Sequence, residues 1–450
     1  MKTRVLCALA ILAFFLAACQ KSTLPTLPIQ PSTQATAIPT PMDPVKEIPT
    51  EAPTIPPTEA PTPLVVETPS PVGCLLAWAA NDSLNCQLEG GAIVNLFMGV
   101  TGANSPQISP SGQWIAFKIP QADQSEQLWV VKIDGSAPRL LVNPLDLPPA
   151  DMGFTPSVLN YEWLAGDAGL LFNTSRVPVS TDIGMYDPNV NDLWRLDFVS
   201  GSQSQLLPSG EGGLFSLSPD RQYVAVSLGT FINLYSVSGD NLTPVAHLPF
   251  ESIITYSEYT YKPTVYWSPD SAFFSVLVPS KDPLAADSSG SIYRVGVDGS
   301  INLRSNPAGN FVFGAGSYSI SPDGKWLASG SYDTSSQYSL RISATDGGIS
   351  SPVATAQGLN GLAWSMDSSQ FAYAISTSDT SGSLHSISLD GVTTDLASVG
   401  RVTSARWLDG SSLVYLTLDG SGWKLWFASS GNGSSLVASG VGSDVQFDLR

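Results

Sequence analysis

Few residue types in this sequence could support catalysis or bind a metal, and their spacing favours neither. The 450 residues include only two histidines, His247 and His385, and four cysteines. There is no G-x-S-x-G, H-E-x-x-H, P-loop or EF-hand pattern, each of which holds a nucleophile or ligands at a defined spacing. Both histidines lie in strand-like runs, "PVAHLPF" and "SLHSISL", where a packing or surface role is expected. We therefore expect no enzyme activity and no cofactor. Bound Ca²⁺ stays an open alternative, although no motif indicates it.

Cys74 and Cys86 are the cysteines best placed to react with each other. They stand twelve positions apart in two consecutive strand-like runs, and a hairpin would set them opposite each other. We predict a disulfide between them, worth about 2–3 kcal/mol by loop entropy. A metal site is the weaker alternative, since both histidines lie far along the chain and no further cysteine follows.

A third cysteine, Cys19, ends an export signal. Lys2 and Arg4 precede the apolar stretch "VLCALAILAFFLAA", which is too short for a comfortable membrane span. The motif Leu16-Ala17-Ala18-Cys19 resembles a bacterial lipobox. The resemblance implies a signal peptide at 1–18, a lipid on the Cys19 thiol, and a protein attached to the outside of the cell membrane or in the cell envelope. The alternative is an ordinary signal peptide with an incidental cysteine.

A Pro/Thr-rich segment, 19–73, follows the signal. It contains 14 of the 35 prolines and ten threonines, and nothing in it could build a core, so we expect a disordered linker. Extended as polyproline II, it would reach on the order of 150 Å. The formal net charge of −18 makes nucleic acid an unsuitable partner. We expect a monomer that contacts the membrane through its lipid alone.

The elements that must position any site lie in 74–450, where a short phrase recurs. "ISPDGKWLASGSYD" has close copies in "ISPSGQWIAFKI", "LSPDRQYVAVSL" and "WSPDSAFFSVLV". Ser321-Pro322-Asp323-Gly324 has the composition of a tight turn, and other copies depart from it more freely than a catalytic motif would. The bulky apolar residue before each turn, here called the marker residue, recurs every 40 to 55 residues, at Ile108, Trp163, Leu217, Trp267, Ile320, Trp364, Trp407 and Phe447.

This spacing suits a four-stranded β-propeller blade. The succession of the W-S-P-D-G turn, an apolar strand and a strand ending in "DG" resembles the WD-like repeat of the TolB family and of the dipeptidyl peptidase propellers. The resemblance implies an all-β propeller of antiparallel blades. The eight marker residues, together with closure of the ring by both ends of this segment, predict eight blades, with seven as the alternative. The chain after Gly73 supplies three strands of one blade, and the terminal "DVQFDLR" supplies the fourth, which closes the ring.

Two kinds of functional site remain. The early repeats are longer, and their extra loops should meet on one rim, where Tyr161, Tyr186, Tyr256, Tyr259 and Tyr261 are candidate binding residues. This favours a non-enzymatic platform for an extracellular or envelope protein or glycan, as TolB-like propellers are. The alternative is a hydrolase or lyase in the central channel, where Glu162 and Arg406 are the charged residues directly before marker residues.

The lipidation hypothesis is tested by Cys19→Ser. The lipid on Cys19 would be the protein's only membrane attachment once the signal is removed, so the variant should leave the detergent phase and become soluble. Cys7→Ser, inside the signal, is the matched control and should partition like the wild type. Retention of the Cys19→Ser protein in the detergent phase would refute the hypothesis.

Overall fold

The computed structural model describes residues 72–80, 82–98, 101–148, 152–180, 186–257, 259–312, 318–332, 337–429 and 433–450. They belong to the compact unit Pro69–Arg450. The predictions for the signal peptide, for Cys19 and for the linker as far as residue 71 lie outside the described residues.

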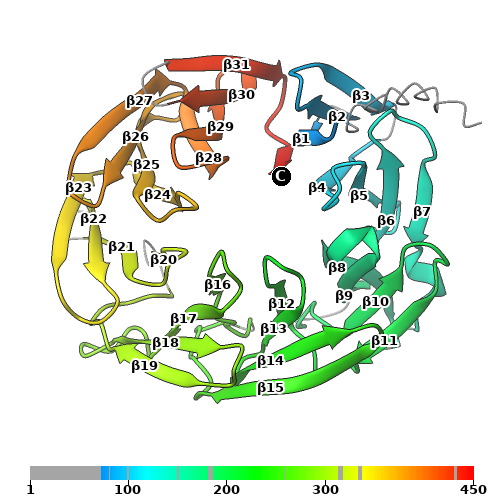
Figure 1. Ribbon diagram of the computed structural model, residues 1–450, viewed down its shortest axis with the longest axis horizontal. Coiled ribbons are helices and arrows are strands. Elements are labelled where there is room, and N and C mark those ends of the chain that lie inside the picture. The colour runs from blue at the N-terminus through cyan, green and yellow to red at the C-terminus, as the bar shows by residue number, and fades with distance from the viewer. Residues whose placement is uncertain are drawn as a thin grey trace, which may run out of the picture. The chain divides into compact units, whose positions relative to one another are not determined.

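The unit is a β-propeller of eight four-stranded antiparallel sheets, as predicted. Figure 1 looks down its axis, with the innermost strands around the centre. From the innermost strand outward, blade 1 consists of β32 (Val445–Leu449), β1 (Cys74–Ala80), β2 (Ser83–Leu88) and β3 (Ile93–Met98). Blade 2 consists of β4 (Asn104–Ile108), β5 (Trp114–Pro120), β6 (Glu126–Lys132) and β7 (Arg139–Val142). Blade 3 consists of β8 (Phe154–Trp163), β9 (Gly169–Pro178), β10 (Leu193–Asp197) and β11 (Gln203–Leu207).

The next five blades follow the same order. Blade 4 consists of β12 (Leu214–Leu217), β13 (Tyr223–Ser227), β14 (Phe231–Ser238) and β15 (Asn241–Pro249), and blade 5 of β16 (Val265–Trp267), β17 (Phe273–Pro279), β18 (Gly290–Gly296) and β19 (Ile301–Ser305). Blade 6 consists of β20 (Tyr318–Ile320), β21 (Trp326–Tyr332), β22 (Tyr338–Ala344) and β23 (Ser350–Ala356). Blade 7 consists of β24 (Leu359–Trp364), β25 (Gln370–Ser378), β26 (Ser381–Ser388) and β27 (Thr393–Val399), and blade 8 of β28 (Arg401–Trp407), β29 (Ser412–Asp419), β30 (Gly422–Ser429) and β31 (Gly433–Gly440).

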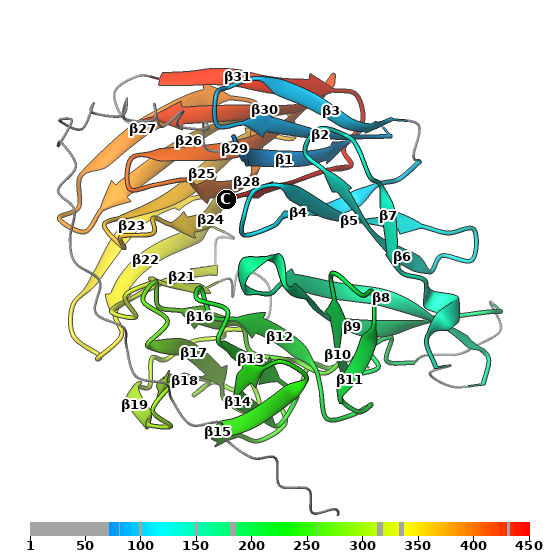
Figure 2. The same cartoon turned by 45° about the vertical axis from the view of Figure 1, so that its right-hand side comes forward.

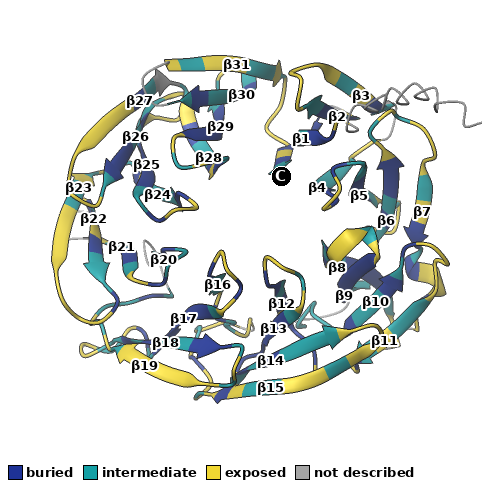
Figure 3. Ribbon diagram, in the orientation of Figure 1, coloured by how far each residue is buried: buried dark blue, intermediate teal, exposed yellow. Residues whose placement is uncertain are grey.

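Helical structure in the described residues amounts to two 3₁₀ turns, η1 (Pro144–Asp146) and η2 (Ala165–Asp167). No helix among these residues has the length and apolar character needed to cross a membrane. Burial follows the blade order: Figure 3 shows buried residues on the second and third strands, and exposed residues along outer strands such as β15, β19, β23 and β27. The core therefore lies between neighbouring blades.

The recurring phrase forms the turn between the first and second strands. In blade 6 the Gly324 N–H donates to the Ser321 carbonyl over 2.8 Å, and the Ser321 hydroxyl donates to the Asp323 carboxylate over 2.6 Å. Gly324 has a φ of +68°, a conformation that glycine adopts without strain. The structural role expected for this phrase is confirmed.

Three blades place a residue with a side chain at this left-handed position, Arg221, Ser271 and Ser368, with φ between +59° and +62°. Each of them contacts the neighbouring blade. The Ser271 hydroxyl accepts the N–H of Asp220, the Ser368 hydroxyl accepts that of Asp323, both over 2.9 Å, and Arg221 pairs with a carboxylate of blade 3. The side chains that replace glycine at this turn position therefore connect adjacent blades.

The marker tryptophans also link the blades. Each indole Nε1–H donates to the carbonyl of the residue that precedes the marker residue of the previous blade, over 3.0 to 3.3 Å: Trp163 to Gln107, Trp267 to Ser216, Trp364 to Ser319 and Trp407 to Ala363. A buried indole combines a large apolar surface with a donor that must be satisfied. These bonds connect the inner strands around the ring.

The ring closes between the two ends of the unit. β32 pairs with β1, and Figures 1 and 2 both show blade 1 beside blade 8. Leu449 lies opposite Leu76, and the Arg450 N–H donates to the Leu75 carbonyl, which is the bond that follows the marker residue in the other blades. The last marker residue is therefore Leu449, and the assignment of Phe447 was two residues off. The partner of β32 is β1, at the other end of the unit, so local sequence gave no signal for its alignment.

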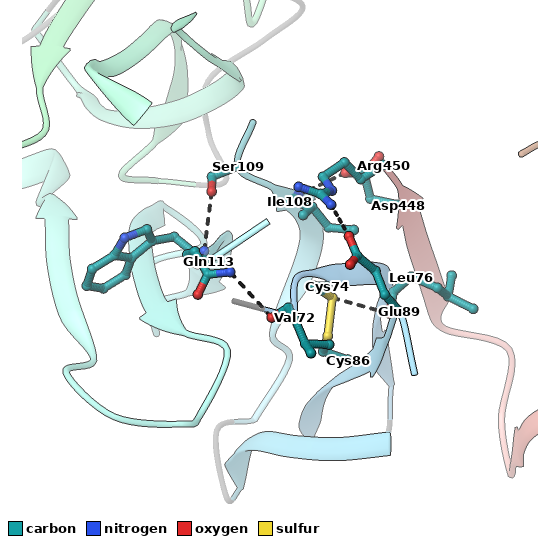
Figure 4. The surroundings of a disulfide bond; sticks show 11 residues. Val72, Cys74, Leu76, Cys86, Glu89, Ile108, Ser109, Gln113, Asp448 and Arg450 are labelled. Carbon is teal, nitrogen blue, oxygen red and sulfur yellow. Dashed lines mark hydrogen bonds and ion pairs between the residues drawn. A yellow bond between two sulfur atoms is a disulfide. The ribbon is translucent and has the colours of Figure 1, made fainter. Parts of the chain in front are cut away.

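Cys74 and Cys86 form the predicted disulfide, with both side chains fully buried and their Cα atoms 5.9 Å apart. Figure 4 shows the bond close to the closure, where Arg450 pairs with Glu89. The Cys74 N–H also donates to the Gly112 carbonyl of blade 2 over 2.9 Å. The first described strand is therefore fastened to its own blade and to the next.

Deletion of 444–450 should destabilise the unit severely. It removes β32, exposes β1, and takes Val445 and Phe447 out of the core between blades 8 and 1. We expect the free energy of unfolding to fall by more than about 4 kcal/mol, the scale for losing one large buried side chain, in urea titrations. Arg450→Ala, which keeps β32 and removes only the side-chain contacts of Arg450 with Glu89 and with the Pro110 carbonyl, is the control and should cost less than about 1 kcal/mol. Equal midpoints for the deletion and the wild type would contradict the closure.

Candidate functional site

Eight residues directly before the marker residues form a column on the inner strands. They are Gln107, Glu162, Ser216, Tyr266, Ser319, Ala363, Arg406 and Asp448. The corrected register adds Asp448 to the two charged residues predicted from the sequence. Arg406 of blade 8 pairs with Asp448 of blade 1 over 2.8 Å, whereas Glu162 of blade 3 pairs with Arg221 of blade 4 over 3.3 Å. Glu162 and Arg406 thus belong to two separate ion pairs.

Glu162 accepts a hydrogen bond from the backbone N–H of Leu217, the marker residue of the next blade, over 3.1 Å. Its side chain is 25% exposed. Burial raises the pKa of Glu162 from the ordinary 4.5 to about 7, and the Leu217 N–H and the Arg221 charge oppose this rise more weakly. Near neutral pH the carboxyl group therefore exists in both protonation states, as a general acid or base requires.

Asp448 repeats this arrangement two blades earlier in the ring. Its carboxylate accepts the N–H of Ile108, again a marker residue of the next blade, over 2.9 Å. Burial raises the pKa of Asp448 above its ordinary value, while the Ile108 N–H and the Arg406 charge oppose the rise. Each carboxylate thus accepts a hydrogen bond from a backbone N–H on the inner edge of the next blade's first strand. This bond alone gives the carboxylate a structural function.

Both carboxylates line a cavity of about 570 Å³ at the end of the axis that carries the first-to-second-strand turns. Its lining includes Glu162, Arg221, Asp448 and Arg450. This volume falls within the range of small-molecule sites. Among the described residues no group of three or more His, Cys, Asp or Glu side chains is arranged to hold a metal ion. The cavity offers mixed charge and one carboxyl group that titrates near neutrality.

The predicted binding tyrosines divide into exposed and packed residues. Tyr256 and Tyr259 are 62% and 56% exposed. Tyr261 is half-buried, with its hydroxyl 3.3 Å from that of Tyr318, and Tyr186 packs on Phe154 with ring centroids 5.0 Å apart.

Tyr161 lies in β8 and is only 2% exposed, so its prediction as a binding residue is wrong. Its hydroxyl donates to the Ala116 carbonyl of blade 2 over 3.1 Å and also contacts the Ser105 carbonyl. The strand begins at Phe154, seven residues earlier, so a segment taken for a loop is largely a strand. The side chain therefore fastens blade 3 to blade 2.

Four long connections of blades 2 to 5 lie on one rim, as the longer early repeats predicted. The β7–β8 and β9–β10 connections are joined by the Val179 N–H, which donates to the Gly153 carbonyl over 2.9 Å. Lys262 of the β15–β16 connection donates to Asn191 of β9–β10 over 2.5 Å. The Ile254 N–H donates to the Lys281 carbonyl of β17–β18 over 2.8 Å. Hydrogen bonds thus connect all four segments.

These four connections expose large apolar side chains, which we call the rim patch: Leu145, Met152, Val179, Ile254, Tyr256, Tyr259 and Leu284. Their exposure ranges from 39% at Ile254 to 100% at Met152. The Tyr256 hydroxyl donates to the Asp282 carboxylate over 2.9 Å, and the Thr255 hydroxyl donates to the Tyr259 carbonyl over 2.6 Å. The exposed aromatic rings therefore project from segments that are already ordered by polar contacts.

Comparisons with known proteins agree on the fold alone. No family model matches the chain, and no curated protein matches its sequence. Among solved structures, a eukaryotic initiation factor has a TM-score of 0.50 at 15% identity, covering 84% of this chain and 88% of its own. An oligogalacturonate lyase in complex with manganese scores 0.46 at 16% identity, covering 76% and 86%. TolB from Acinetobacter baumannii scores 0.32 at 16% identity, covering 72% and 78%. At identities this low the similarity shows the fold alone and does not indicate function.

The pKa of Glu162 predicts a pH-dependent stability. A carboxyl group whose pKa is raised by folding stabilises the native state below about pH 4.5, and this contribution is lost as the pH rises through about 7. Relative to Glu162→Gln, which keeps an acceptor for Leu217, the wild type should lose on the order of 3 kcal/mol between these limits. Urea unfolding from pH 4.5 to 8 measures the difference.

Glu251→Gln is the control for this measurement, since it neutralises a carboxylate that is 73% exposed. The Glu162→Gln difference should change with pH by far more than the Glu251→Gln difference. Equal changes in the two variants would show that burial does not raise the pKa of Glu162.

Proposed function

We propose that this protein is an exported, lipid-tethered platform whose propeller binds a protein partner through the rim patch. The observation that supports the proposal is that four connections joined by hydrogen bonds each carry exposed apolar side chains. Exposed apolar residues grouped in this way are typical of interaction surfaces. The lipobox-like motif before Cys19 and the Pro/Thr-rich segment supply the tether in this proposal.

The order of the tyrosine segment supports binding at low entropic cost. Tyrosine side chains provide a large contact area with few rotatable bonds. The contacts of Tyr256 with Asp282 and of Thr255 with Tyr259 hold the segment before a partner arrives. A preordered surface loses less conformational entropy on association, so more of the contact energy contributes to affinity.

The aliphatic members of the rim patch favour a protein over a glycan. Met152 is fully exposed, and Leu284 is 58% exposed. A sugar ring stacks on aromatic faces and hydrogen-bonds to polar groups, whereas flexible aliphatic side chains adapt to apolar pockets of another protein. The carboxylates Glu251 and Asp282 on the same connections would surround the contact with polar groups.

A channel hydrolase or lyase is the second candidate, and the axial cavity with Glu162 favours it. Glu162 would act as the acid or base and Arg221 as the cation that binds an anionic group. The described residues include no cluster of metal ligands, so a calcium titration followed by thermal melting tests whether Ca²⁺ takes part in this alternative and separates it from the platform. A rise in melting temperature that Glu162→Gln abolishes would favour the channel.

The rim hypothesis predicts the effect of Tyr256→Ala combined with Tyr259→Ala. Both side chains are exposed, so the melting temperature should stay within about 2 °C, while affinity for the partner falls by at least about 2 kcal/mol, or roughly 30-fold. The measurement is quantitative retention of envelope proteins on immobilised protein beginning at residue 20, followed by titration of the purified partner.

Two variants control this experiment. Met366→Ala removes a side chain that is 53% exposed on the β24–β25 turn, at the opposite rim, and should bind normally. Tyr261→Ala removes a ring from the core between blades 4 and 5 and should lower stability. Unchanged affinity in the double tyrosine variant would exclude the rim patch as the contact surface.

A further inference from the structure

Blade 7 contains a serine, a histidine and an aspartate linked in a row. The Ser383 hydroxyl oxygen lies 2.6 Å from Nε2 of His385, and Nδ1 of the same ring lies 2.7 Å from a carboxylate oxygen of Asp395. Both separations are within the range of strong hydrogen bonds. The axial cavity and the rim patch include none of these residues.

The backbone of one hairpin positions all three side chains. Ser383 and His385 stand two apart in β26, so they point to the same face of the sheet. Asp395 of β27 lies directly opposite His385 in the antiparallel register. A bulge between Leu384 and His385 sets this register.

The order of the groups is the one that activates a hydroxyl. A carboxylate at Nδ1 fixes the ring tautomer, with the proton on Nδ1 and the lone pair of Nε2 directed at the serine. Nε2 can then take the hydroxyl proton as the oxygen attacks an electrophile. In this arrangement Ser383 and His385 have catalytic roles, and Asp395 is a positioning residue.

The surroundings restrain the ring and leave an approach from solvent. The imidazole stacks on Tyr373 of β25, with centroids 5.1 Å apart and planes 21° apart. The His385 side chain is 15% exposed, the Asp395 side chain is 85% exposed, and Ser383 is half-buried. A small molecule can therefore reach the row at the blade surface.

Blade 1 holds the same row built from amides. Asn85 donates to the Ser83 hydroxyl over 3.1 Å, Asn95 donates to Asn85 over 2.9 Å, and the two asparagines are opposite each other in the register. A blade of this fold therefore forms with a row that contains no proton-accepting imidazole, so the fold itself does not require the histidine of blade 7. The chain contains only one other histidine, His247 in β15, and its Nδ1 contacts Asn233 instead of a carboxylate.

We propose that Ser383 is a nucleophile activated by His385 and Asp395, and that it cleaves small activated acyl esters. The Ser383 oxygen bonds to the acyl carbon while His385 takes its proton, and the ester C–O bond breaks as His385 returns the proton to the departing alcohol. Water then hydrolyses the acyl-serine to a carboxylic acid and regenerates the hydroxyl. β26 is an interior strand, so its N–H groups form hydrogen bonds within the sheet and are not free to stabilise an oxyanion. We therefore expect the substrates to be activated esters with good leaving groups.

The test uses the full soluble chain from residue 20 with p-nitrophenyl acetate and a fluorophosphonate probe. We expect a burst of one p-nitrophenol per chain and one probe adduct, located by mass spectrometry on Ser383. Ser383→Ala should lose both. Because the reaction involves blade 7 alone, its outcome is independent of partner binding at the rim.

The decisive variant combines His385→Asn with Asp395→Asn, which reproduces the blade 1 row. It should melt like the wild type and acylate at least about 100-fold more slowly, the scale of general-base catalysis. Asp395→Asn alone should slow acylation by a smaller factor, and Asn85→His with Asn95→Asp should make Ser83 reactive. No adduct on Ser383 of the folded wild type, or equal rates in the double variant, would overturn the proposal.

Discussion

The pairing of β32 with β1 is the interaction on which the rest of the propeller depends. Every other blade is a continuous meander that could form from local sequence, but blade 1 forms only when the two ends of the unit meet. Without that pairing β1 would present an open edge, and the core between blades 8 and 1 would lose one wall. The closing contacts are accordingly dense, since Asp448 bonds to both Arg406 and Ile108, and Arg450 bonds to Glu89.

Contacts between blades come mainly from residues that were expected to serve a turn or a strand. The marker tryptophans donate hydrogen bonds across the blade boundary, and the serine hydroxyls at two left-handed turn positions accept backbone N–H groups of the neighbouring blade. Each repeat is therefore specified partly by its neighbour. Glu162 and Asp448 extend this principle to the axis, where a carboxylate satisfies the N–H of the next blade and also lines a cavity.

Patterns with a local physical cause were predictable from the sequence. The turn chemistry of Ser321-Pro322-Asp323-Gly324, the eight blades and the disulfide all followed from short-range composition and spacing. Asp448 was missed because its strand pairs with β1, which is distant in sequence, so no local turn motif aligned the two strands. Tyr161 was misplaced because the burial of a residue near a loop depends on where the strand begins. The contact of His385 with Asp395 depends on the register of a hairpin, which composition alone does not specify.

The disulfide next to the first described residues has a mechanical consequence. Any tension along the preceding chain would enter the propeller at Val72 and Gly73 and meet Cys74 at once. The bond to Cys86 divides that load between β1 and β2, and the Cys74 N–H passes part of it to blade 2. Hydrogen bonds loaded together in shear resist far more force than bonds opened one after another like a zipper. A disulfide at the point where force enters the domain would protect a protein that is attached by one end and exposed to liquid flow.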